Sequence, residues 1–185
     1  NGWHGAENRS RIPGEVGASA VQNVGAYGAE AKDIIMKVEA VEAATGRVVE
    51  FTNGECGYGY RQSRFKGEWK NRYFITHVTY ALSRTFTPLL HYGNIIGALE
   101  RKGIASPTAQ QVRDAVIEIR RSKLPDPAEV GNAGSFFMNP IVDRCRFEQL
   151  LALYPQMPHY DVDADHVKIP AGWMIEQCGW KGRSL

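Results

Sequence analysis

Cysteine pairs, net charge and long apolar runs are all scarce in this chain of 185 residues. The three cysteines, Cys56, Cys145 and Cys178, form no Cys-x-x-Cys pair and leave an odd count. Neither a disulfide framework nor a zinc site is therefore expected, and the five histidines show no metal-ligand spacing either. The sequence therefore predicts no bound metal. Unpaired cysteines fit a protein of a reducing compartment, the cytoplasm.

The charge balance and the lack of long apolar runs exclude two further classes of protein. A formal net charge of +2 with scattered basic residues provides no basic patch for nucleic acid. No apolar run reaches the length of a membrane span, so no membrane segment is expected. With 43% hydrophobic and 23% charged residues, the chain has the composition of a globular protein that buries a core. It begins without Met, and we expect it to be an internal part of a longer protein.

Alternating side chains and turn signals predict an α+β fold whose first part is rich in strands. Residues 34–43 alternate, and a glycine-containing turn at 45–47 leads into a second strand at 48–51, which is typical of a hairpin. A third strand is expected over 73–82. Its alternating side chains are Phe74, Thr76, Val78 and Tyr80.

Three helices are also predicted. Ser106 followed by Pro107 is a capped helix start, Asp143 can cap a second helix, and Pro170 can open a third. The side chains expected to be buried are Val112, Ala115, Val116 and Ile119 in the first helix, Phe147, Leu150 and Leu151 in the second, and Met174, Ile175 and Cys178 in the third. Residues 124–134 contain two Pro and two Gly, so a domain boundary is expected there.

Three segments could form a ligand site. Residues 131–140 place the Ser135 hydroxyl among small residues and amides, where it could exchange a proton with a ligand, although a Gly/Asn-rich turn explains the segment as well. Residues 12–28 contain four glycines whose N–H groups could hold a diphosphate, but they match neither Gly-x-Gly-x-x-Gly nor a Walker motif and could equally be a surface loop. Residues 58–66 place the Arg61 guanidinium in a turn, suited to a carboxylate or phosphate, or to stacking on a tyrosine.

Five motifs in register resemble the UDP-N-acetylenolpyruvoylglucosamine reductase family over nearly the whole chain. They are Val-Gln-Asn-Val-Gly-Ala-Tyr-Gly (21–28), Gly-Tyr-Arg-Gln-Ser-Arg-Phe-Lys (59–66), Lys-Leu-Pro-Asp-Pro (123–127), Gly-Asn-Ala-Gly-Ser-Phe-Phe (131–137) and Ala-Gly-Trp-Met-Ile-Glu-Gln-Cys-Gly (171–179). In this family NADPH reduces FAD, and the flavin then reduces an enolpyruvyl UDP-sugar to UDP-N-acetylmuramate, a precursor of the bacterial cell wall.

The resemblance implies how the chain is organised. It would hold the second, strand-rich FAD-binding lobe at 1–124 and a small α+β substrate-binding domain at 125–185, incomplete at both ends. The first FAD lobe and the C-terminal segment of the same protein would then be its partners, and the isolated chain is expected to be inactive.

The resemblance also implies roles for individual residues. Arg61 would hold the substrate carboxylate and stabilise the charge that develops there, and Ser135 would donate a proton. FAD contacts would come from Pro13, Gly14, Gly17, Ala18, Ser19, Gln22, Asn23, Gly25, Ala26 and Tyr27. UDP-sugar contacts would come from Tyr92, Lys123, Asn139 and Gln177. Without the resemblance, these last four are typical of a strand-end tyrosine, a helix-end cation and two cap or turn amides.

Three residues depart from the family pattern. Met138 stands where a lysine is usual, which removes a cation near Ser135. Arg9 and Arg11 stand where leucines are usual, and we expect both to face the absent lobe and to be exposed to solvent; ordinary divergence is the alternative explanation. Two other classes of protein stay open: a nucleotide-sugar-binding module without flavin, and an unrelated β-rich interaction domain.

Overall fold

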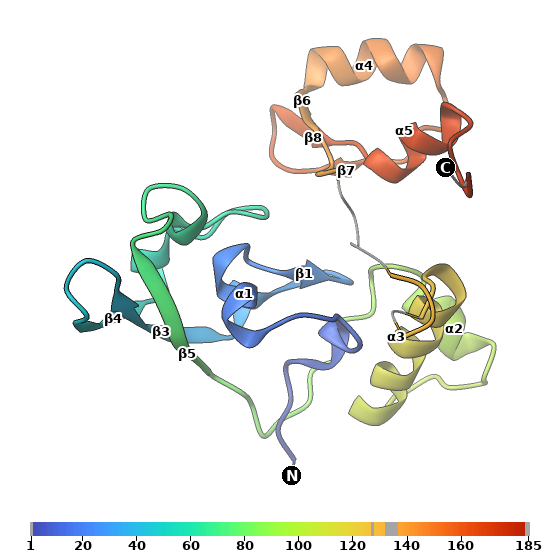
Figure 1. Cartoon of the computed structure of the whole chain (residues 1–185). Helices are drawn as coiled ribbons and strands as arrows, with labels where there is room; N and C mark the ends of the chain where they lie inside the picture. The colour runs from blue at the N-terminus through green and yellow to red at the C-terminus, as the bar shows by residue number, and fades with distance from the viewer. Residues whose placement is uncertain (1, 127, 132–136, 184–185) are drawn as a thin grey trace. The chain divides into compact units, whose positions relative to one another are not determined.

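The structure, a computed structural model, describes residues 2–126, 128–131 and 137–183. The chain divides into two compact units between Gly131 and Asn132, and Figure 1 shows the elements of each. Both units combine helices with antiparallel sheets, which confirms the predicted α+β class. The division into domains at 1–124 and 125–185 stays a prediction.

A three-stranded antiparallel sheet is the main feature of the first unit. Its strand order is β4 (Val48–Thr52), β3 (Ile35–Glu42) and β5 (Tyr73–Tyr80). These are the hairpin and the third strand that the sequence predicts, so that part of the prediction is confirmed. Short 3₁₀ helices connect the elements of this unit: η1 (Glu7–Arg9), η2 (Ala31–Asp33), η3 (Gly54–Cys56) and η4 (Arg64–Lys66).

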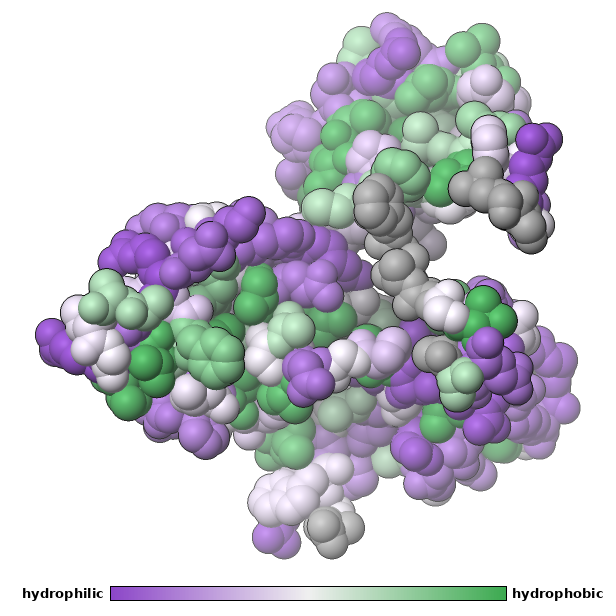
Figure 2. All heavy atoms as spheres, in the orientation of Figure 1, coloured by the Kyte–Doolittle hydropathy of each residue, from purple (hydrophilic) through white to green (hydrophobic). Residues whose placement is uncertain are grey.

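A bulge in β5 changes which of its side chains face the core. Thr76 is skipped in the pairing of β5 with β3, so the inward positions shift by one residue. The β5 side chains that pack on the core are Tyr73, Ile75, Val78 and Tyr80. The predicted alternation through Phe74 is therefore wrong, because Phe74 lies on the outer face and is 74% exposed. Hydrophobic surface is visible over this strand-rich part in Figure 2.

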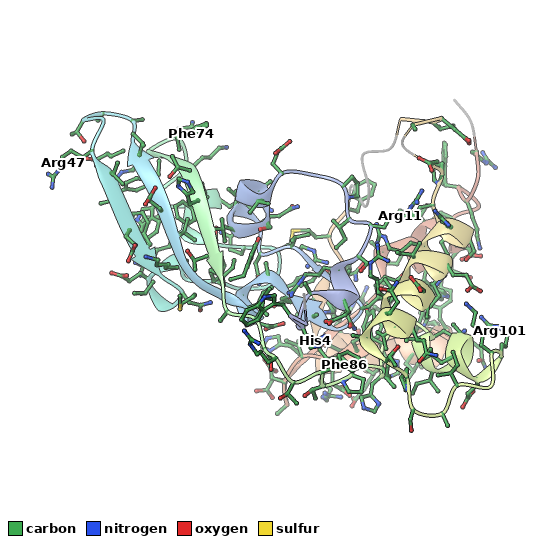
Figure 3. The ribbon with its side chains drawn as sticks, turned by 90° about the horizontal axis from the view of Figure 1, so that it is seen from below. His4, Arg11, Arg47, Phe74, Phe86 and Arg101 are labelled. Carbon is green, nitrogen blue, oxygen red and sulfur yellow. The ribbon has the colours of Figure 1, made fainter. Side chains whose placement is uncertain are left out.

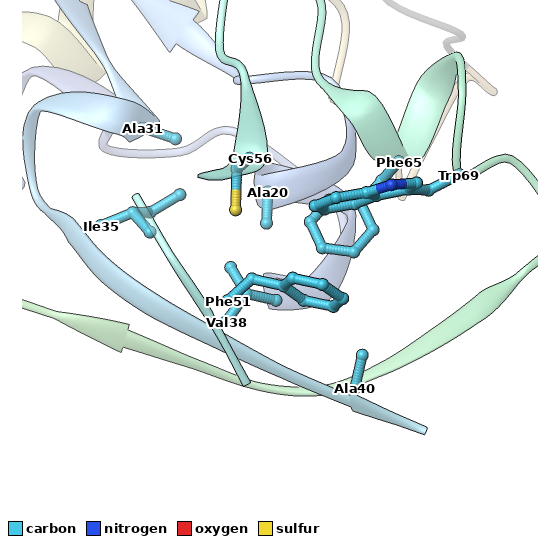
Figure 4. Close-up of a cluster of buried hydrophobic side chains, with 9 residues drawn as sticks. All are labelled: Ala20, Ala31, Ile35, Val38, Ala40, Phe51, Cys56, Phe65 and Trp69. Atoms are coloured by element: carbon cyan, nitrogen blue, oxygen red, sulfur yellow. The ribbon is translucent and has the colours of Figure 1, made fainter. Parts of the chain in front are cut away.

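Aromatic rings anchor the core beneath the sheet (Figure 4). The centroid of the Phe51 ring lies 4.3 Å from that of Trp69 and 5.6 Å from that of Phe65. Offset and edge-on contacts of this kind each add about 0.5–1.5 kcal/mol beyond the burial of area. The buried members of the cluster are Ala20, Ala31, Ile35, Val38, Ala40, Phe51, Cys56, Phe65 and Trp69.

The glycine-rich segment 12–28 is more regular than the surface loop that composition suggests. It contains helix α1 (Val16–Val21) and strand β1 (Gly25–Ala26), which pairs with β2 (Ala29–Glu30). Helix α1 packs against β5, where Gly17 lies beside Ile75. The core sheet therefore fixes the position of this segment.

Two helices form the rest of the first unit. They are α2 (Ile95–Glu100) and α3 (Ala109–Lys123), and the four side chains predicted to be buried in α3 are buried. The predicted start at Ser106 is wrong, because Thr108 is the residue that caps α3. Its hydroxyl accepts the Gln111 N–H at 3.3 Å while the Gln111 side chain accepts the Thr108 N–H at 2.8 Å.

The second unit has a three-stranded antiparallel sheet and two helices. The strand order is β6 (Ile141–Asp143), β8 (His166–Lys168) and β7 (Tyr160–Asp161). Helix α4 (Arg144–Leu153) begins as predicted, since the Asp143 carboxylate accepts the Arg146 N–H at 2.7 Å. It buries Phe147, with Leu150 and Leu151 half-buried in the same cluster.

Helix α5 (Ala171–Gln177) follows Pro170 as predicted, but it buries a different face. Ala171 is buried and Trp173 packs on the core of the second unit. The prediction that Met174, Ile175 and Cys178 are buried is wrong, because all three are exposed. In the ranges that the structure describes, no helix is long and apolar enough to cross a membrane.

Candidate cofactor and substrate site

A cavity of about 390 Å³ lies beside helix α1 in the first unit. Its walls come from the segment before α1, from α1 itself and from the end of β5, and most of the lining side chains are apolar. The polar side chains of the wall are Arg9, Glu15, Ser19, Gln22 and Tyr80. A mainly apolar cavity with a few polar groups is typical of a small-molecule site, for which volumes of roughly 300–1,000 Å³ are common. The predicted FAD residues that line the cavity are Pro13, Gly14, Ala18, Ser19 and Gln22.

Two hydroxyl groups in the cavity wall are bonded to each other. The Ser19 Oγ and Tyr80 Oη atoms lie 2.6 Å apart, and Ser19 Oγ also donates to the carbonyl of Val16 at 2.5 Å. Because a serine hydroxyl carries one proton, Tyr80 is the donor in the pair. The lone pairs of the Tyr80 oxygen can therefore accept a hydrogen bond from a ligand.

Arg61 lies at a tight turn that faces the predicted cofactor segment. Gly59 and Gln62 exchange two backbone hydrogen bonds of 3.0 and 3.2 Å across the turn, and Arg61 has a φ of 54°. A positive φ is uncommon for a residue with a side chain and carries strain that the surrounding contacts must offset. The turn therefore fixes the direction in which the half-buried Arg61 side chain leaves the backbone.

The Arg61 guanidinium contacts strand β1. Its Nη2 donates to the carbonyl oxygen of Gly25 at 2.6 Å, and the group lies 5.2 Å from the centroid of the Tyr60 ring. A Cβ atom at position 25 would lie 2.8 Å from Arg61 Nη1, so glycine is what allows this approach. A residue predicted to bind the substrate carboxylate and a residue predicted to bind FAD are thus in direct contact.

Asn23 is completely buried and holds the cofactor segment together. Its Nδ2 donates to the Glu30 carboxylate at 3.0 Å and to the Gly59 carbonyl at 2.8 Å. Its Oδ1 accepts the Lys32 N–H at 2.9 Å. Because protein groups already use both ends of this amide, the structure supports positioning of the segment rather than direct contact of the side chain with FAD.

Tyr27 and Tyr92 lie on two adjoining segments. A Cβ on Gly93 would come within 2.4 Å of the Tyr27 ring, and a Cβ on Gly28 would lie 3.3 Å from Tyr92 Cβ. The φ angle is 70° at Gly93 and 79° at Gly28, a backbone conformation that favours glycine. Both the backbone conformation and the lack of space for a Cβ therefore require glycine at these positions. Burial raises the pKa of the Tyr27 hydroxyl, and the nearby Arg120 opposes that shift. The predicted cofactor segment, which includes Ala26 in β1, therefore lies beside the predicted substrate residue Tyr92.

The end of helix α3 carries one of the predicted UDP-sugar contacts. Lys123 is the last residue of α3 and is exposed. Arg120 in the same turn donates from Nε to the carbonyl of Arg11 at 3.1 Å, and Figure 3 shows Arg11 beside α3. Arg11 also forms a 2.7 Å ion pair with Asp126. The start of the cofactor segment and the end of α3 are thus tied together.

In the second unit, the predicted substrate residues lie at the two ends of helix α5. Asn139 Oδ1 accepts the Ala171 N–H at 2.9 Å, which is the helix-capping role that its residue type suggests. Gln177 is the last residue of α5 and is exposed. Ser135 lies outside the described residues, and Met138 is 51% exposed.

The sequence analysis missed three polar residues of the cavity, Arg9, Glu15 and Tyr80. Arg9 was expected to be exposed, and this prediction is wrong because its side chain is half-buried and lines the cavity. Arg11 is exposed as predicted. Tyr80 belongs to the alternating side chains that the sequence predicts for β5, but nothing in that alternation marks it as a cavity residue.

The structure is that of an α+β protein with a cavity beside a short helix, and comparisons give the class. Residues 126–185 match the family described as the C-terminal domain of UDP-N-acetylenolpyruvoylglucosamine reductase. The solved structure of such a reductase from Thermus caldophilus aligns with 98% of this chain and 48% of its own, with a TM-score of 0.54 and 20% identity. That likeness supports the fold.

Relatives that carry the same name match along the whole chain. The reductase of Bacteroides fragilis is 55% identical over 183 residues, which are 99% of this chain and 54% of that protein. The reductase of Burkholderia ambifaria is 48% identical over 187 residues, which are 54% of its length. The chain is thus similar to the UDP-N-acetylenolpyruvoylglucosamine reductases along its length, and residues 126–185 match the family of their C-terminal domain. It spans about half the length of these curated relatives.

Proposed function

We propose that the chain is part of a reductase that uses NADPH and FAD to convert UDP-N-acetylenolpyruvoylglucosamine to UDP-N-acetylmuramate, in the synthesis of peptidoglycan precursors. The names of relatives up to 55% identical support the reaction. The single observation in the structure that carries the proposal is the contact between Arg61 and Gly25. It joins a guanidinium suited to a carboxylate with the segment predicted to bind the cofactor.

The cavity beside α1 fits part of an FAD molecule. Its apolar walls suit a flat heteroaromatic or a ribityl chain, and its hydroxyl pair and glycine backbone can meet polar groups. The residues that would hold FAD there are Pro13, Gly14, Ala18, Ser19 and Gln22. The other predicted FAD residues do not line the cavity and would hold the lining residues in position. They are Gly17, Asn23, Gly25, Ala26 and Tyr27. FAD, when bound, supplies the hydride for the substrate double bond and is reduced again by NADPH.

Arg61 would bind the carboxylate of the enolpyruvyl group. Reduction at one carbon of the double bond builds negative charge on the next carbon, which the carboxylate delocalises. A guanidinium that is already held in place stabilises this charge without reorganisation. One donor of Arg61 is used by Gly25, which leaves other donors of the planar fork for a carboxylate.

Ser135 would donate the proton that completes the reduction. A serine hydroxyl is a weak acid, so it acts only on a strongly basic carbon and at close range. The UDP-sugar would be bound by Tyr92, Lys123, Asn139 and Gln177, with Lys123 at the diphosphate.

The three cysteines are free, which supports a reducing compartment and hence a cytoplasmic enzyme.

The proposal is tested on the full-length protein that contains this chain. It should purify with the yellow colour of a flavin and should oxidise NADPH only when enolpyruvyl UDP-N-acetylglucosamine is added. A colourless protein that still binds UDP-sugar would instead be the nucleotide-sugar-binding module. A protein that binds neither ligand would contradict both readings.

A further inference from the structure

Arg9 brings a positive charge to the wall of the cavity beside α1. It is the last residue of η1, and its half-buried side chain lines the cavity. Its guanidinium donates to two backbone carbonyls, from Nη2 to Gly5 at 2.5 Å and from Nη1 to Glu30. These two bonds fix the orientation of the group but leave further N–H donors on it.

No carboxylate among the described residues pairs directly with Arg9, although the charges of Asp33 and Glu7 act on it. None of the ion pairs among the described residues includes Arg9. Burial lowers the pKa of its guanidinium, and the more distant charges of Asp33, Tyr80 and Glu7 offset this only in part. An arginine stays protonated even so, and a half-buried cation without a carboxylate gains from an anionic partner.

We propose that Arg9 makes this cavity selective for anionic ligands, and that its guanidinium contacts a phosphate of a flavin nucleotide whose apolar part occupies the cavity. The planar fork of an arginine matches the oxygens of a phosphate. The apolar walls around it suit the body of such a ligand. The flavin part of this proposal rests on the proposed function, whereas the anion selectivity rests on the half-buried Arg9, since the carboxylate in the same wall, Glu15, is exposed to solvent.

Riboflavin and FMN provide the test, because they share one ring system and differ by one phosphate. Their affinities for the 185-residue chain are measured by flavin fluorescence in the parent, in Arg9→Gln and in Arg11→Gln. Arg9→Gln removes the charge but keeps an amide donor for the carbonyls. Arg11→Gln is the matched control, since it removes the same charge from an exposed side chain outside the cavity wall.

The parent and Arg11→Gln should bind FMN about tenfold more tightly than riboflavin, and Arg9→Gln should bind the two about equally. The same ratio in all three proteins would overturn the role of Arg9 and leave the proposed flavin chemistry intact. If neither flavin binds, inorganic pyrophosphate decides the matter. A rise in Tm with pyrophosphate that Arg9→Gln abolishes would keep the anion site and remove the flavin, and no rise would overturn the inference.

Discussion

At the scale of single residues, the contact between Gly25 and Arg61 is a close approach that a larger residue would disturb. A methyl group on residue 25 would meet Arg61 Nη1 at 2.8 Å and the Ala29 carbonyl at 3.1 Å. The guanidinium would have to shift to make room for a Cβ in that place. Gly25 therefore determines the position of the group that we assign to the substrate carboxylate.

The substitution Gly25→Ala should lower the free energy of unfolding by about 1–3 kcal/mol, the usual cost of overpacking. Gly17→Ala is the control, because its Cβ would lie 3.5 Å from Ile75 Cγ2, an ordinary contact. It should change stability by less than about 1 kcal/mol. Urea denaturation measures both, and equal stabilities of the two variants would show that the Arg61 contact is not as tight as described.

Asn23 gives a second residue-level prediction. Asn23→Ala leaves the Lys32 N–H and the Gly59 carbonyl without their partner in a buried place, which should cost about 2–3 kcal/mol. Its neighbour Gln22 is exposed, so Gln22→Ala should change stability by less than about 0.5 kcal/mol. Urea denaturation measures the free energy of unfolding of both variants. It thereby distinguishes the buried amide of Asn23, which holds the segment together, from the amide of Gln22, which only lines the cavity. An Asn23→Ala variant as stable as Gln22→Ala would contradict the positioning role.

At the scale of elements, the sequence predicted the strands well because alternation and turn residues report local structure. It failed where a long-range contact decides the outcome. The inward face of β5 changes at the bulge at Thr76, which depends on the register with β3 rather than on the sequence of β5. In α5, the apolar residues Met174 and Ile175 follow a helical spacing, but the contacts of Ala171 and Trp173 determine which face is buried.

The start of helix α3 shows the same limit and allows a direct test. Both Ser106 and Thr108 are hydroxyl residues before the helix, and only Thr108 makes the reciprocal bonds with Gln111. Thr108→Ala should therefore cost about 1 kcal/mol of stability, and Ser106→Ala should cost much less. Thermal unfolding of the two variants distinguishes the caps, and a larger loss for Ser106→Ala would contradict the observed start.

The candidate site was predictable from the sequence only in part. The resemblance named Pro13, Gly14, Ala18, Ser19 and Gln22, which the structure brings to one cavity. Composition alone named none of them, because glycine-rich segments are common in turns. Arg9 could not be found from sequence, since its burial depends on carbonyl groups of Gly5 and Glu30 that approach it only in the folded chain.

At the scale of the whole molecule, the chain spans about half the length of its curated relatives. We propose that the rest of the full-length protein supplies the other side of the FAD site and the C-terminal segment. The 185-residue chain alone should therefore not oxidise NADPH in the presence of the enolpyruvyl substrate, whereas the full-length protein should. Turnover by the chain alone, followed by NADPH absorbance, would show that these residues suffice.

The most direct measurement of the central claim is the kcat of Arg61→Ala in the full-length protein, with Arg64→Ala as the control. Arg64 lies three residues further along, is exposed, and forms its 3.6 Å ion pair with Glu68 at the surface. Loss of a charge that stabilises the transition state typically lowers kcat by about 100- to 1,000-fold. We expect that loss for Arg61→Ala and near-normal turnover for Arg64→Ala. Near-normal turnover in both variants would contradict the role of Arg61 and, with it, the account of the site.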